Sequence, residues 1–141
     1  MGFRWAIGNV TKYLGQIALR MGKVAAAEEY FLQSLKIAND LGMDRDIANI
    51  FYEIARVRVS QDRKKEAIEI IGMLLELPAS SQERFGSGRI IESAEELLAS
   101  LEGHFSTHTL MEKLNRGKEL DPADFMSELL ISDRVIGKSK Q

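Results

Sequence analysis

The 141-residue sequence contains no cysteine and only 2 prolines, and both shortages exclude particular structures. Without cysteine, the chain has no disulfide, no cysteine-ligated zinc and no thiol nucleophile. Two widely spaced prolines leave room for long helices. The longest apolar runs are too short to span a bilayer, and the N-terminus lacks the basic-then-apolar order of a signal peptide. These absences predict a soluble, cytoplasmic protein with no membrane segment.

The charge and the composition further limit the functions that the sequence can have. The net charge is -2, and 28% of the residues are charged, which is ordinary for a globular protein. A general nucleic-acid binder would carry a basic face, so no direct nucleic-acid contact is expected. The length suits one domain with a core, or a short array of repeats.

Residues 9–38 read as two amphipathic helices folded back on each other at the turn 21–23. Small residues stand where the two helices must approach closely, namely Gly15, Ala18 and Ala27. Large residues are expected to fill the space between the helices, namely Leu14, Phe31 and Leu35.

This pattern of small and large residues resembles the tetratricopeptide repeat, a helix-turn-helix unit that stacks into a solenoid. The matching positions, in order and spacing, are Leu14, Gly15, Gly22, Ala27, Phe31 and Leu35. Two positions depart from the motif: Thr11 replaces the usual bulky aromatic, and Ala18 replaces tyrosine. The resemblance implies an all-α fold with a right-handed stack of hairpins.

A second copy follows at a period of 40 residues, the separation of Ala27 and Ala67. Under this shift, four motif residues fall on Ile54, Ala55, Ile71 and Leu75. The period exceeds the common one of about 34. The amino-acid sequence of the turn at 39–44 resembles that of a long-repeat subclass found in bacterial signalling regulators. The four helices are expected at 3–21, 24–41, 48–60 and 64–77.

The remaining sequence predicts a helical cap. Pro78 ends the second repeat, and Ser80 to Glu83 form a capping box. Further helices are expected at 82–101, at 107–115 with Gly117 closing it, and from Pro122 behind the cap Asp121. The predicted parts are repeats at 1–42 and 43–78, a cap at 79–136 and a flexible tail at 137–141.

The segment 77–130 carries a second resemblance, to the C-terminal end of large bacterial transcriptional and signal-transduction regulators. In those proteins, a tetratricopeptide array follows an NTPase or DNA-binding module. The resemblance implies that this chain is the C-terminal part of a larger regulator, used for sensing or assembly through protein–protein contacts.

Candidate chemistry is sparse, so no enzyme activity and no cofactor are expected. The glycine-rich stretch at 85–89 lacks the lysine and hydroxyl residue of a phosphate loop. The alternative function is a small metal-binding or enzymatic domain, because His104, His108 and Glu112 have helical spacing. Gly103 and the capping residue Ser106 predict a break between the two histidines.

The leading candidate site is the concave face, which the first helix of each repeat lines in a tetratricopeptide array. The motif register assigns to it Asn9, Lys12, Gln16, Arg20, Asn49, Tyr52, Arg56 and Ser60. Amides and hydroxyls suit a peptide backbone, and the cations favour an acidic or C-terminal peptide. The family's carboxylate clamp is not reproduced, because Glu53 stands where that pattern has asparagine.

The N-terminal edge is the second candidate surface. The first helix begins with Phe3, Trp5 and Ile7, and terminal repeats normally carry a polar outer face. An uncovered apolar patch of this kind attracts another protein surface. We therefore expect a homodimer in which the first repeats of two chains cap each other.

Overall fold

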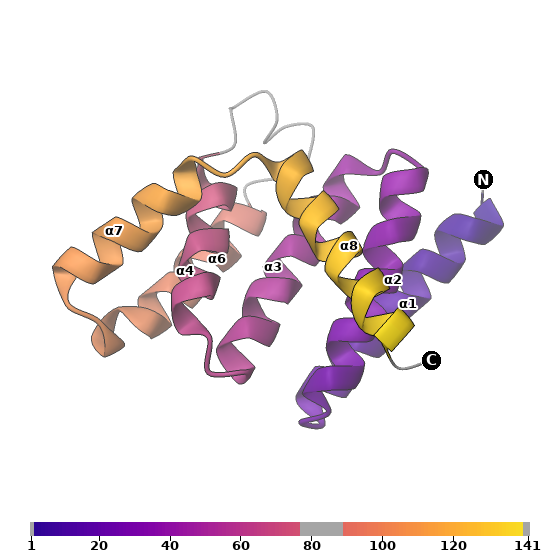
Figure 1. Ribbon diagram of the computed structural model, residues 1–141, viewed down its shortest axis with the longest axis horizontal. Helices are drawn as coiled ribbons and strands as arrows, with labels where there is room; N and C mark the ends of the chain where they lie inside the picture. Colours follow the sequence, from indigo (N-terminus) through magenta and orange to yellow (C-terminus); the bar gives the residue numbers. More distant parts are fainter. Residues whose placement is uncertain (1, 77–88, 140–141) are drawn as a thin grey trace.

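The computed structural model describes residues 2–76 and 89–139, with side chains described up to Ile131. Over these residues the chain has seven α-helices, one 3-10 helix and no strand, which confirms the all-α class (Figure 1). In chain order the elements are α1 (Gly2–Arg20), α2 (Val24–Asp40), α3 (Asp44–Ser60), α4 (Lys64–Leu75), α6 (Arg89–Leu101), η1 (Glu102–His104), α7 (Thr107–Lys118) and α8 (Pro122–Ser139).

The first four helices form two hairpins that turn at equivalent positions. Gly22 has a φ of 77°, and Asp62, 40 residues later, has a φ of 61°. Glycine adopts this left-handed region without steric cost, and aspartate tolerates it better than most residues. The backbone N–H after each turn donates to the carbonyl five residues back, from Lys23 to Ala18 at 2.9 Å and from Arg63 to Arg58 at 2.8 Å. The 40-residue register therefore recurs in the backbone.

Glycines on α1 allow the helices of the first hairpin to pack closely. A Cβ added to Gly15 would lie 2.6 Å from the Phe31 ring, and one added to Gly8 would lie 2.9 Å from Ile37. The Ser34 hydroxyl donates to the Gly8 carbonyl oxygen at 2.8 Å in this buried contact. The small and large positions predicted between the helices are buried, namely Gly15, Ala18, Ala27, Phe31 and Leu35.

Leu14 is an exception to that prediction. It does not fill the space between α1 and α2, because 42% of its surface is exposed. Its repeat equivalent, Ile54, is fully buried because α3 has a preceding hairpin beside it. The motif position at Leu14 therefore packs between repeats and not within one.

The second hairpin supplies most of the core. α3 packs against both α2 and α4, and α4 is buried along most of its length. α3 begins at Asp44, before the expected start at 48, and Asp44 and Asp46 lie in its first turn, where carboxylates favour a helix N-terminus. The largest fully buried side chains of this hairpin are Ile50, Ile54, Val57, Ile68, Ile71 and Leu74.

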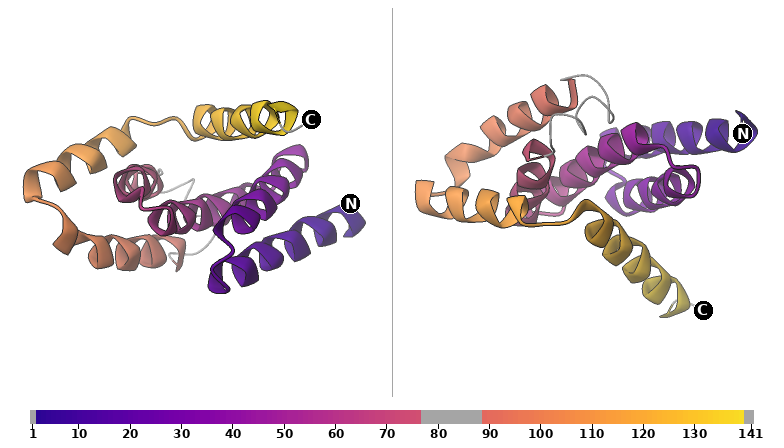
Figure 2. Two further views of the ribbon diagram at one scale, coloured as in Figure 1. Left: turned by 60° about the horizontal axis from the view of Figure 1, so that its bottom comes forward. Right: turned by 90° about the horizontal axis from the view of Figure 1, so that it is seen from above.

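α6 and α7 pack on different sides of α4, as Figure 2 shows. Gly117 was expected to close a helix near residue 115, but it lies inside α7, which continues to Lys118. The reason is tertiary: α7 crosses α4 so closely that Gly117 faces Gly72 and the Glu69 carbonyl. The Ser106 hydroxyl accepts a hydrogen bond from Thr109 N at 3.2 Å, so the predicted cap of α7 is present.

α8 runs back along the molecule toward the N-terminal helices, in front of α2 in Figure 1. It starts as predicted, with Asp121 Oδ1 accepting a hydrogen bond from Ala123 N at 2.9 Å. The Phe125 ring meets the Phe51 ring of α3 edge-on at a centroid distance of 5.2 Å, and α8 also contacts α2. The helix extends to Ser139, so residues 137–139 of the predicted tail are helical.

Three predicted features lie outside the described residues: the helix end at Pro78, the capping box at residues 80–83 and the glycine-rich stretch as far as residue 88. None of the helices described is long and apolar enough to cross a membrane.

Candidate functional site

The residues predicted for the concave face lie on α1 and α3, which are in contact with each other. All eight are at least partly exposed, although Tyr52 also packs against the core. On α1 they are Asn9, Lys12, Gln16 and Arg20, and on α3 they are Asn49, Tyr52, Arg56 and Ser60. We refer to these eight residues as the polar face.

A buried carboxylate joins the two helices at the centre of the polar face. Glu53 is 6% exposed and accepts a hydrogen bond from Gln16 Nε2 at 3.2 Å. Its other oxygen lies 3.1 Å from Arg56 Nη1. The Arg56 charge is therefore balanced inside the protein, and the face is less basic than its three cations suggested. The spacing of Glu53 and Arg56, three residues apart on one helix, is the sequence signal for this pair.

Tyr52 lies next to this carboxylate, on the side of α3 that approaches α6. Burial is the main factor that raises the pKa of its hydroxyl, and Glu53 and Glu96 raise it further against the opposing effect of Arg56. The hydroxyl is therefore neutral at physiological pH and can both donate and accept a hydrogen bond.

A shallow pocket lies beside the polar face, where α1 meets the end of α2 and the start of α3. Its lining combines an indole, an amide, a cation and a carboxylate, from Trp5, Asn9, Lys12 and Asp46. The rest of its lining is largely apolar and includes Ile37, Ala38, Leu41 and Met43. Trp5, which was predicted to belong to the self-association edge, also lines this pocket.

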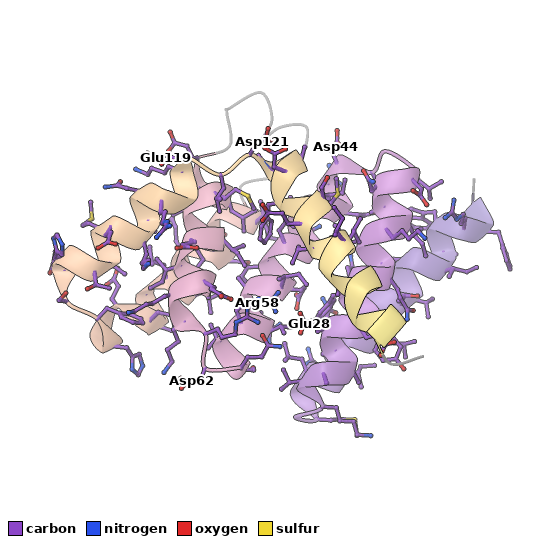
Figure 3. All side chains as sticks on the ribbon, in the orientation of Figure 1. Glu28, Asp44, Arg58, Asp62, Glu119 and Asp121 are labelled. Carbon is purple, nitrogen blue, oxygen red and sulfur yellow. The ribbon has the colours of Figure 1, made fainter. Side chains whose placement is uncertain are left out.

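A second polar cluster fixes the first hairpin to the second (Figure 3). Arg58 of α3 is 7% exposed, and its Nη1 lies 2.8 Å from Glu28 Oε1 of α2. Gln61 joins them, because its amide donates to Glu28 Oε2 at 2.7 Å and its oxygen accepts from Arg58 Nη1 at 2.9 Å. Arg58 Nε lies 3.5 Å from Glu66 Oε2 at the start of α4.

The electrostatics of this cluster favour the ionised form of Glu28. Burial tends to raise the pKa of Glu28, but the hydrogen bond and charge of Arg58, with Gln61 and Arg63, lower it overall. The cluster was not identified from the sequence, because its members come from two hairpins and no local spacing connects them. Its position at the junction of three helices indicates a structural role.

The outer side of α1 carries exposed apolar residues. Six of them recur at alternating spacings of three and four, and we call this set the α1 apolar row: Phe3, Ile7, Val10, Leu14, Ile17 and Met21. Phe3 is 83% exposed and Val10 is 57% exposed. The sequence prediction included Phe3 and Ile7 but did not extend the row along the whole helix.

The candidate metal ligands do not form a cluster. His104 lies in η1 and His108 in α7, with the predicted break between them. His108 Nε2 is 3.9 Å from Glu112 Oε2 on the exposed side of α7. Among the described residues, no group of three or more histidine, cysteine, aspartate or glutamate side chains is arranged to hold a metal ion.

With this geometry established, the chain was compared with known proteins: no family model matches it, and no curated protein or solved structure is significantly similar to it.

Proposed function

We propose that the chain is a protein–protein interaction module of the tetratricopeptide type, and that its polar face binds a peptide. The observation that carries this proposal is the contrast between the exposed and buried sides of α1 and α3. The sides toward the polar face carry amides, hydroxyls and cations, while the packing positions of α3, apart from Glu53 and Arg58, are apolar and buried. Polar residues along two adjacent helices provide hydrogen-bond partners for an extended backbone.

The charges of the polar face favour an acidic peptide. Lys12 and Arg20 are at least partly exposed, whereas Arg56 is compensated by Glu53 at 3.1 Å. The Lys12 ammonium lies 5.5 Å from the centroid of the Tyr13 ring and lines the pocket with Trp5. A carboxylate of the peptide would pair with Lys12, and an apolar side chain next to it would contact the indole. The resemblance of segment 77–130 favours a role in the sensing or assembly part of a bacterial regulator.

The test uses Trp5, which is the only tryptophan of the chain, as the reporter. Acidic and basic peptides of equal length are titrated while the Trp5 emission and the polarisation of a labelled peptide are recorded. We expect the acidic peptide to bind and to shift the Trp5 emission. Lys12→Glu should weaken binding, whereas Lys36→Glu, an exposed change on α2, should not.

Three results would contradict the proposal: no acidic peptide binds, Lys36→Glu weakens binding as much as Lys12→Glu, or the bound peptide leaves the Trp5 emission unchanged.

A further inference from the structure

The α1 apolar row is uncovered at positions where the second hairpin is fully packed. The repeat equivalents of its central residues are Ile47, Ile50, Ile54 and Val57 of α3, and all four are buried. α3 packs against α2 of the preceding hairpin. The chain itself therefore shows what covers such a row: the side of another helix.

Among the described residues, only α1 of a second copy presents a comparable row of exposed apolar side chains. At the far end of the two hairpins, α4 is covered by α6 and α7 of the same chain. The apolar residues of α4 are almost completely buried. α4 therefore has no exposed apolar row against which α1 of another copy could pack. Head-to-tail association is thereby blocked, and the self-complementary solution is a two-fold contact.

The residues on either side of the row also favour contact with α1 of a second copy over contact with a charged helix. α1 has no acidic residue, Arg4 pairs with Asp40 at 2.8 Å, and Lys12 lies toward the pocket. Only Arg20 borders the row, and the other residues on that margin are Ala6 and Tyr13. An acidic partner helix would find one cation along the whole contact.

We propose that α1 forms a two-fold dimer by antiparallel packing against α1 of a second copy. The row is symmetric about residue 12, so antiparallel packing places Phe3 opposite Met21 of the second copy. Ile7 then lies opposite Ile17, and Val10 opposite Leu14. Each Arg20 then falls beside Ala6 of the other copy.

The size of the row is compatible with a weak, specific dimer. The six large side chains of the row are each at least 42% exposed. On a typical monomer the largest apolar patch, of roughly 300–600 Å², is itself often functional. The smaller specific interfaces bury about 600 Å² per partner, so a contact along a single helix should give a weak dimer. The polar face and the pocket stay accessible, because Trp5 and Lys12 are not members of the row.

Sedimentation over a range of protein concentrations tests the interface. Wild-type protein should dimerise, and Val10→Glu should weaken the dimer by roughly a hundredfold or more, because symmetry introduces the buried carboxylate twice. The matched control is Met111→Glu on α7, since Met111 is 49% exposed and lies outside the row. This control should dimerise like the wild type. Circular dichroism checks that both variants remain helical.

Cross-linking tests the direction of the helices, since the chain has no cysteine of its own. A mixture of Phe3→Cys and Met21→Cys chains should be joined by a short thiol cross-linker. Phe3→Cys alone should not be, because the two positions are about 27 Å apart along antiparallel helices, at 1.5 Å per residue.

Three results would overturn the proposal. If the protein is a monomer at all concentrations, the row does not form a dimer contact and would have to be covered by a helix of another protein. A dimer that survives Val10→Glu would use a different surface. Efficient cross-linking of Phe3→Cys to itself would indicate parallel packing.

Discussion

Gly72 of α4 and Gly117 of α7 face each other across a helix crossing that has no room for a side chain on either residue. A Cβ on Gly72 would lie 2.5 Å from the Leu114 carbonyl oxygen, and one on Gly117 would overlap the Glu69 carbonyl oxygen. The Lys113 ammonium approaches Glu69 Oε1 at 3.7 Å beside the crossing. The closeness of these backbones fixes how the C-terminal helices cover α4.

Gly117→Ala should therefore destabilise the protein. Alanine favours a helix over glycine by up to about 1 kcal/mol, but here the added methyl group meets backbone that cannot move independently. We expect a net loss of about 1–3 kcal/mol in the free energy of unfolding, measured by chemical denaturation. Gly103→Ala is the control, because a Cβ there meets nothing within 4 Å. Equal stability of the two variants would contradict the close crossing.

Ala27→Leu and Ala67→Leu test the 40-residue register. Both alanines are fully buried at equivalent positions in the two hairpins. Each leucine should overpack its helix pair and cost about 1–3 kcal/mol, seen as a lower melting temperature. Ala25→Leu, an exposed change on α2, should leave the melting temperature nearly unchanged. A tolerant Ala67 with a sensitive Ala27 would show that the two hairpins are not equivalent.

The Glu28 cluster predicts a loss of stability in acid. The folded pKa of Glu28 lies below its ordinary value of 4.5, so the stability it contributes is present above that value and is lost as the pH falls through the folded pKa. Glu28→Gln should lower stability near neutral pH and reduce the loss of stability as the pH falls below 4.5. Denaturation at several pH values measures both effects. Glu29→Gln, an exposed neighbour, should retain the wild-type pH profile.

Peptide binding at the polar face should weaken as ionic strength rises. Salt screens exposed charges over about 10 Å at 0.1 M, and Lys12 is only partly buried. Lys12→Glu should therefore bind the acidic peptide more weakly and with a smaller dependence on salt. An unchanged salt dependence in this variant would show that Lys12 does not contact the peptide.

The sequence was most informative where a feature depends on a few neighbouring residues. The turn at Gly22, the cap Asp121 and the close packing of Gly15 against Phe31 were all predicted. These features follow from backbone freedom, side-chain reach and size, which act over one or two helical turns.

Features set by distant residues were missed or misplaced. From the sequence, Gly117 was interpreted as a helix end, and only the crossing of α7 over α4 explains why a glycine is there. Leu14 was interpreted as a core residue, but no helix in the described part of the chain covers its outer side. The polar face was predicted from a motif register, but the burial of Glu53 depends on how α1 meets α3. The charge balance of the candidate site could be determined only with both helices in place.

The return of α8 changes how the molecule should unfold. In a linear array each repeat contacts only its neighbours, and the ends can unravel separately. Here the edge-on contact of Phe125 with Phe51, and the packing of α8 on α2, tie the end of the chain to its first half. Losing either part exposes apolar surface on the other. The helices should therefore melt together in one cooperative transition, and partial unfolding from the C-terminus should be rare.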